Sequence, residues 1–210
     1  MRKLIHAADS LKAAFIDYVL ETFDDSVVIG HEVMYGSYGK FADMVLLYKG
    51  DIYAVEVKSD ADNLNRIDSQ ISEYQKQFNY VIVVCGEKYR KQLKDRLPKG
   101  IGLYTVSENA NINELRKPAR KTRLDKTEML FSIKVAYLSK KADFPTANIG
   151  CDAIRSIYAK KRISCVQEVL YNYWISRMKP GFNNFLSDRG CQTLPVDLQN
   201  FTTYHVLPTF

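Results

Sequence analysis

Residues 40–58, KFADMVLLYKGDIYAVEVK, constrain the fold of this chain more than any other stretch. They form two apolar runs, 41–48 and 52–58, with a turn between them, which is typical of a β-hairpin. Three charged residues nevertheless lie inside the predicted strands, namely Asp43, Glu56 and Lys58. A buried charge is costly unless it is paired, so the pattern indicates that these groups meet one another.

The position of the hairpin loop decides which of the charged residues face each other. A two-residue loop at 49–50 puts Asp43 opposite Glu56, whereas a loop at 50–51 puts Asp43 opposite Lys58. In either register the three groups are neighbours, because opposed residues have Cβ atoms about 4.5–5.5 Å apart and residues two apart share a face. A three-residue loop would break this pairing.

Two carboxylates this close repel each other, and an apolar environment increases the cost. A divalent cation relieves the repulsion, and carboxylate oxygens are ligands that Mg²⁺ prefers, together with water and phosphate oxygens. Bound Mg²⁺ lowers the pKa of a coordinated water, and a nearby lysine can orient that water or stabilise charge developing at phosphorus. The hairpin therefore predicts a metal site for phosphodiester hydrolysis built from Asp43, Glu56 and Lys58.

The remaining elements up to residue 107 alternate between helical and strand patterns. The predicted helices are 9–23, capped by Asp9 or Ser10, then 63–78 and 87–97, and the strands outside the hairpin are 26–35, 80–85 and 101–106. The order is helix, three meandering strands, helix, strand, helix, strand. It predicts an α/β fold with a mixed central sheet flanked by helices.

Past residue 107 the strand signal stops. A basic linker comes first, helical stripes follow over 127–141 and 151–178, and the segments 179–190 and 194–210 have the composition of irregular structure. We therefore expect a core over 1–107 and a basic, mostly helical region over 108–210 that can pack on it.

Charge is distributed unevenly between the two halves. Residues 1–110 have a net charge of −2 and residues 111–210 a net charge of +8, which together give the +6 of the whole chain. This excess favours a polyanionic partner, DNA before an anionic membrane, although a solvated basic surface is the plain alternative. The residues concerned are Arg116, Lys117, Arg120, Lys121, Arg123 and Lys126 in the linker, followed by Lys160, Lys161 and Arg162.

The sequence contains no run of eighteen apolar residues and no signal-peptide pattern, so we expect a soluble, cytoplasmic protein without a membrane partner. The four cysteines have no metal-ligand spacing, which predicts reduced, buried thiols; they are Cys85, Cys151, Cys165 and Cys191. The three histidines show no catalytic spacing either; His31, beside Glu32, could approach the site, but a position at the surface is favoured.

The hairpin and its flanking helices resemble the PD-(D/E)XK nuclease superfamily over roughly residues 8–106. Asp43 matches the Asp of that motif, and Glu56-Val57-Lys58 matches its (D/E)XK, while Ala42 replaces the variable proline. Within the superfamily, the segment is most similar to an uncharacterised family of small bacterial and phage nucleases. The resemblance implies a restriction-endonuclease-like core, with Asp43, Glu56 and the carbonyl of Val57 as metal ligands and Lys58 as the catalytic lysine.

Three further site residues are implied by the same resemblance. Glu32, on the strand before the hairpin, is at a position where such nucleases often carry an additional acidic ligand. Gln70 and Tyr74 match the Q-x-x-x-Y pattern of the RecB-like branch. They share one helix face and could position the lysine or a phosphate.

The sequence thus predicts a deoxyribonuclease that uses Mg²⁺, for which Mn²⁺ can substitute, and that binds DNA through its basic C-terminal half. One alternative is a non-cleaving nucleic-acid-binding or interaction protein that retains the nuclease fold, and another is a basic regulator that reads DNA with residues 111–210. A homodimer and a phage or defence partner are both compatible with the sequence. The substrate form, the mode of cleavage and any base specificity stay open.

Overall fold

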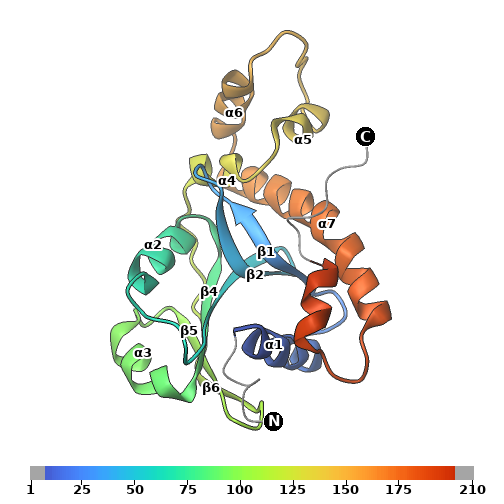
Figure 1. Ribbon diagram of the computed structural model, residues 1–210. Coiled ribbons are helices and arrows are strands. Elements are labelled where there is room, and N and C mark those ends of the chain that lie inside the picture. Colours follow the sequence, from blue (N-terminus) through green and yellow to red (C-terminus); the bar gives the residue numbers. More distant parts are fainter. Residues whose placement is uncertain (1–7, 202–210) are drawn as a thin grey trace.

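The structure, a computed structural model that describes residues 8–201, is built on one six-stranded mixed sheet with the strand order β1-β2-β3-β4-β5-β6 (Figure 1). The first three strands form an antiparallel meander, β3, β4 and β5 are parallel, and β6 returns antiparallel to β5. Their bounds are β1 (Val28–Tyr35), β2 (Lys40–Tyr48), β3 (Asp51–Lys58), β4 (Tyr80–Gly86), β5 (Gly102–Val106) and β6 (Ile112–Arg116). The predicted α/β class with a mixed central sheet is confirmed.

The β2–β3 hairpin has the first of the two registers considered above. Tyr48 pairs with Asp51, and Lys49 and Gly50 form the loop with positive φ angles of 48° and 85°. Two positive φ angles define the type I′ turn, whose twist matches that of the strands it joins. The paired ladder ends at Met44 and Val55, so Asp43 and Glu56 lie at the point where β2 and β3 part.

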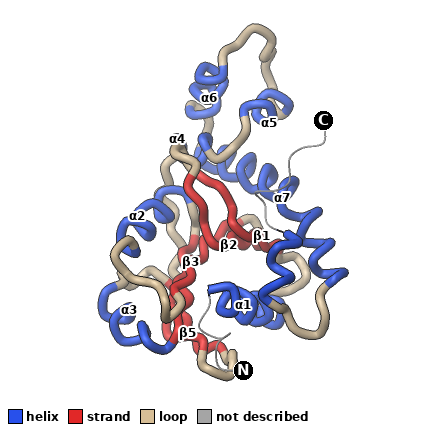
Figure 2. The backbone as a smooth tube through the Cα atoms, viewed as in Figure 1, coloured by secondary structure: helices blue, strands red, loops and turns tan. Residues whose placement is uncertain are grey.

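Helices cover both sides of the sheet. In Figure 1, α2 (Ile67–Gln77) and α3 (Arg90–Arg96, preceded by the short helix η1, Glu87–Tyr89) lie on one side, and α1 (Ala8–Thr22) lies on the other. Figure 2 shows the strands as one continuous layer between these helices. The predicted helices are therefore present, although α1 begins at Ala8, so that Asp9 lies in its first turn instead of capping it.

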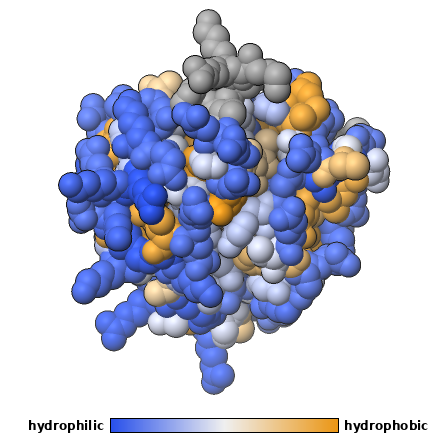
Figure 3. Space-filling model, turned by 90° about the horizontal axis from the view of Figure 1, so that it is seen from below, coloured by the Kyte–Doolittle hydropathy of each residue, from blue (hydrophilic) through white to orange (hydrophobic). Residues whose placement is uncertain are grey.

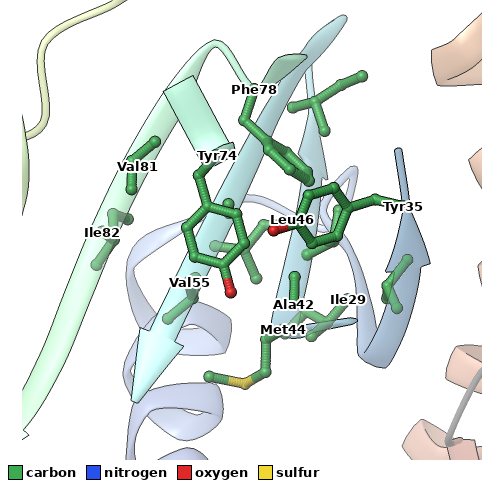
Figure 4. Packing of buried hydrophobic residues seen from close by; sticks show 14 of the residues in the cluster. Ile29, Tyr35, Ala42, Met44, Leu46, Val55, Tyr74, Phe78, Val81 and Ile82 are labelled. Atoms are coloured by element: carbon green, nitrogen blue, oxygen red, sulfur yellow. The ribbon is translucent and has the colours of Figure 1, made fainter. Parts of the chain in front are cut away.

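The C-terminal region packs on the same core as the N-terminal region. Its helices are α4 (Lys126–Phe131), α5 (Val135–Lys140), α6 (Cys151–Ala159), α7 (Ile163–Asp188) and η2 (Pro195–Phe201). The Trp174 ring of α7 stacks on Phe78 at the end of α2, with ring centroids 5.5 Å apart. Figure 4 shows Phe78 beside Tyr74 and Tyr35, so one aromatic cluster joins α2, β1 and α7.

Three expectations for the C-terminal half were wrong. Residues 194–210 were expected to be irregular, but Pro195–Phe201 forms η2, and residues 202–210 lie outside the described part of the chain. The strand signal does not stop at residue 107, because Ile112–Arg116 forms β6; as an edge strand it is largely exposed and lacks the apolar alternation of a buried strand. Residues 179–190 are not irregular, because α7 continues through Pro180 to Asp188. Burial of Met178, Phe182 and Phe185 at helical spacing outweighs the cost of the proline.

The cysteines agree only in part with the prediction from the sequence. All four cysteines are free, as expected, but the expectation of burial holds only for Cys85, because the other three are exposed in α6, in α7 and in the loop after α7. Figure 3 shows one face of the molecule, on which hydrophilic side chains predominate and hydrophobic ones form separate patches. No helix between Ala8 and Phe201 combines the length and apolar character needed to cross a membrane.

Candidate active site

Glu56 is the centre of a buried hydrogen-bond network at the carboxyl end of β3. Its side chain is only 2% exposed. Lys58 Nζ and Gln70 Nε2 donate to Oε1, at 2.6 and 2.5 Å, and Tyr74 Oη donates to Oε2 at 2.5 Å. Three donors from two elements therefore hold this carboxylate in a single orientation.

The helix α2 supplies two of these donors because Gln70 and Tyr74 are one helical turn apart. Tyr74 is fully buried, and Figure 4 shows its ring against Val55 with the hydroxyl pointing along β3. The Q-x-x-x-Y pair was predicted to position the lysine or a phosphate. In the structure both side chains donate hydrogen bonds to Glu56.

Asp43 lies opposite Glu56, at the point where β2 and β3 part, and the backbone of β3 holds its side chain. Its Oδ2 accepts a hydrogen bond from the backbone N–H of Val57 at 2.7 Å, in place of a ladder bond between the strands. Burial, and next the charge of Glu56, raises the pKa of Asp43 to about 7, although the charge of Lys12 opposes the shift. The repulsion predicted from the sequence is thus present in the fold.

Lys12, on α1, belongs to the same cluster and was missed by the sequence analysis. It is 5% exposed, its Nζ donates to Glu32 Oε1 at 2.6 Å, and it lies 4.0 Å from Asp43 Oδ1. Burial lowers its pKa, but Asp43 and Glu32 outweigh this effect and the pKa is raised overall. A signal was available: Lys12 is spaced three and four residues from the apolar Phe15 and Ile16, inside the stripe that faces the core.

Glu32 reaches this cluster through an unusual backbone conformation. Its φ angle is 49°, in the left-handed region that a non-glycine residue seldom adopts. The neighbours His31 and Val33 pair with β2, whereas Glu32 has no partner in the register. Such strain is typical of functional positions. Glu32 therefore lies beside the cluster, and its Oε1 accepts a hydrogen bond from Lys12.

His31 was expected at the surface, and this expectation was wrong, because α1 and the C-terminal η2 cover its ring and leave the residue 7% exposed. Burial, and next the charge of Lys12, lowers its pKa to about 4, so the ring is neutral near neutral pH. Its Nε2 lies 3.1 Å from Lys12 Nζ and can accept a hydrogen bond from it. The other two histidines, His6 and His205, lie outside the described residues.

The basic linker lies at the opposite end of the sheet from this cluster. The backbone N–H of Lys121 donates to Asn79, just before β4, and Arg120 pairs with Asp51, the first residue of β3. Five residues separate Asp51 from Glu56, which is about 17 Å along a strand. The linker therefore does not border the candidate site.

Several linker cations serve the fold itself. Arg116 donates to the carbonyls of Leu97 and Ile101, and Lys126 donates to those of Ala159 and Lys161. Of the nine cations named in the sequence analysis, five are exposed, namely Lys117, Arg120, Arg123, Lys160 and Arg162, and the other four are half-buried, namely Arg116, Lys121, Lys126 and Lys161.

Within residues 8–201, no group of three or more His, Cys, Asp or Glu side chains is arranged to hold a metal ion. Of the four predicted ligands, the structure brings Asp43, Glu56 and Val57 together, with Glu32 on the far side of Lys12. Asp43 and Glu56 accordingly form a site with two carboxylates at most, and Lys12 and Lys58 lie beside it.

This chain is similar to one curated phage protein and to one solved structure. The protein cII of Enterobacteria phage P4 is 27% identical over 101 residues, which cover 47% of this chain and 38% of that protein. The chain thus spans well under half of its curated relative. A solved structure, the SPO1766 protein of unknown function from Silicibacter pomeroyi, is 18% identical and has a TM-score of 0.42, covering 53% of this chain and 71% of that one.

The match to the family as a whole is far more extensive. The model of the family described as bacteriophage P4 protein cII matches residues 2–200, which include every strand of the sheet and the whole candidate site. This chain belongs to the bacteriophage P4 protein cII family.

Proposed function

We propose that this protein is a metal-dependent nuclease that hydrolyses phosphodiester bonds in DNA, with a core of the restriction-endonuclease-like type. The observation that carries the proposal is the meeting of Asp43, Glu56 and Lys58 where β2 and β3 part. The order of helix, antiparallel meander, helix and parallel strand supports the assignment of the core.

The residues present fit a divalent cation in two respects. Asp43 and Glu56 offer hard carboxylate oxygens, and the pKa of Asp43 is raised first by burial and next by the charge of Glu56, both of which a cation would offset. The Oε1 atom of Gln70 is a buried acceptor with no hydrogen-bond partner among the described residues, so it can accept a hydrogen bond from a water in the site. Asp43, Glu56 and the carbonyl of Val57 would hold the ion.

The side chains of the site have separate roles in this proposal. A bound Mg²⁺ would activate a water and offset the charge of the phosphate. Gln70 and Tyr74 fix the Glu56 carboxylate, and the backbone of Val57 fixes Asp43, so that both ligands are oriented in advance. Lys58 donates one N–H to Glu56, and its other two donors can face the attacking water or a phosphate oxygen.

The test is cleavage of a supercoiled plasmid and of linear and single-stranded DNA in the presence of Mg²⁺ or Mn²⁺. We expect Asp43→Asn, Glu56→Gln and Lys58→Met each to lower the rate by about 10²-fold or more, the scale of losing one preorganised group at a transition state. Lys76→Met, which makes the same charge change as Lys58→Met at a side chain near the end of α2 that is 41% exposed, is the control. Site variants that cut DNA as fast as the control would refute the proposal.

The alternative is a nucleic-acid-binding or interaction protein that does not cleave. One observation favours it: both oxygens of Glu56 are already satisfied by three protein donors, so the network is complete without an ion. The same assays separate the two functions. Binding of DNA at low salt that is insensitive to Mg²⁺, with no cleavage of any substrate, would favour the alternative.

A further inference from the structure

Lys12 has no role in the proposed reaction, yet it is among the most buried charged side chains of the described chain. It comes from α1, whereas the rest of the site comes from the sheet and α2. Its ammonium contacts Glu32 at 2.6 Å and His31 at 3.1 Å, and it faces Asp43 at 4.0 Å. It therefore lies between the two carboxylates at this side of the site.

A single divalent ion would nearly neutralise the net charge of the site. Three carboxylates, Glu32, Asp43 and Glu56, face two ammonium groups, Lys12 and Lys58, which leaves one negative charge. Asp9 is 3.7 Å from Lys12, but its side chain is 58% exposed and screened by water. One divalent ion would leave a single positive charge to meet a phosphodiester, whereas two ions would leave three positive charges.

The geometry also opposes a second ion beside Lys12. An ion shared by Glu32 and Asp43 would need both oxygens at about 2.0–2.1 Å, and it would have to occupy the place of the ammonium. Lys12 is held there by the neutral ring of His31 and by the apolar neighbours of its helix. Displacing it would leave a lysine buried without its acceptors, which is costly.

On the basis of the metal-dependent function proposed above, we infer that Lys12 supplies the fixed positive charge that a second divalent ion would otherwise supply. The site accordingly takes one divalent ion per chain, bound between Asp43 and Glu56. Glu32 serves as the partner that positions Lys12, not as a metal ligand.

Binding of Mn²⁺ to the full chain, measured by calorimetry and by electron paramagnetic resonance, tests this without using activity. We expect one ion per chain for the wild type and for Lys12→Arg, which keeps the charge. Glu32→Gln should also bind one ion with less than a threefold change in affinity. Lys76→Met, near the end of α2, should match the wild type.

Removing the charge of Lys12 should open the second position. Lys12→Met is expected to bind two ions per chain, because Glu32 and Asp43 then lack a cation. The double variant, Lys12→Met with Glu32→Gln, should return to one ion. Thermal unfolding with and without Mn²⁺ identifies the folded variants, and Glu32→Gln decides the matter if Lys12→Met does not fold.

Each other result counts against the inference. Two ions on the wild type, loss of the ion in Glu32→Gln, or one ion on folded Lys12→Met would overturn the role of Lys12 and leave the nuclease proposal standing. No bound ion on the wild type would instead overturn the metal-dependent function, and this inference with it.

Discussion

The two ends of β3 carry acidic residues in opposite environments. At the amino end, Asp51 pairs with Arg120, and the two side chains are 23% and 46% exposed, so the pair is partly open to solvent. At the carboxyl end, Glu56 is almost completely buried and is held by three donors. Exposed pairs contribute little, whereas a buried charge must be fully paired to be tolerated. Only the carboxyl end therefore has a charge arrangement that stability alone does not explain.

The basic linker, residues 116–126, lies at the amino ends of the strands. It is tied down by its backbone, because the N–H groups of Ala119, Lys121 and Asp125 donate to Gly100, Asn79 and Lys76. Its charged side chains also contact the fold, because Arg116 and Lys126 donate to backbone carbonyls and Arg120 pairs with Asp51. The cations that are prominent in the sequence thus belong to a segment that crosses the amino ends of the strands, whereas the buried charges lie at the carboxyl end of β3.

Substitution of the acidic residue at each end of β3 should give the largest difference in the free energy of unfolding. Glu56→Ala leaves Lys58, Gln70 and Tyr74 without their acceptor, and breaking a buried pair in this way costs about 3–5 kcal/mol. Asp51→Ala should cost only about 0–1 kcal/mol, as for exposed pairs. Urea unfolding of both variants measures the difference, and equal losses would abolish the contrast.

At the amino end the largest effect should come from a buried amide, not from a charge. Asn79 is 2% exposed, and its Oδ1 accepts a hydrogen bond from the backbone N–H of Ile52 at 3.0 Å. Asn79→Ala leaves that donor unsatisfied, at a cost of about 1–3 kcal/mol. Asn113→Ala, on the exposed edge strand β6, is the control and should be within about 0.5 kcal/mol of the wild type. An Asn79 variant as stable as this control would contradict the assignment.

At the carboxyl end one substitution should stabilise the protein. Asp43→Asn keeps an oxygen for the N–H of Val57 but removes the repulsion by Glu56. The pKa of Asp43 is raised to about 7, so its contribution to stability is present at low pH and is lost as the pH rises through 7. We expect the variant to be about 0.5–2 kcal/mol more stable than the wild type at pH 8 in EDTA, and the gain to vanish near pH 4. Destabilisation at pH 8 would mean that Lys12 already compensates Asp43 in full.

The smallest effect on stability is expected in the linker. Arg123 is exposed, so Arg123→Gln should change the free energy of unfolding by less than about 0.5 kcal/mol. If the C-terminal half contacts DNA phosphates, the same substitution should reduce the slope of log affinity against log salt by about 0.9. An unchanged slope in a fluorescence-anisotropy titration would remove Arg123 from the DNA-binding surface.

Much of the fold could be predicted because its strands and helices are strongly patterned. The hairpin was predicted with two alternative registers, of which the structure has the first, and the stripe of α2 placed Gln70 and Tyr74 on one face. The edge strand β6 and the end of α7 could not be predicted in this way, because an exposed edge needs no apolar alternation and a buried helix can tolerate an internal proline.

Some residues of the candidate site could be predicted from the sequence and others could not. Asp43, Glu56 and Lys58 were found because residues on adjoining strands have fixed neighbours at short range. Lys12 and His31 were not, because their burial depends on how α1 and η2 lie against the sheet. Their contacts span many residues, and no local pattern encodes the direction from which a helix approaches.

The sequence by itself determined the α/β class, the hairpin and the three charged residues that this hairpin brings together, since backbone geometry enforces these relations over a few residues. Only the tertiary structure decided that a second lysine joins the site and that the basic linker lies at the far end of the sheet. Both depend on the packing of distant segments, where the burial of apolar surface, and not the charge pattern, selects the arrangement.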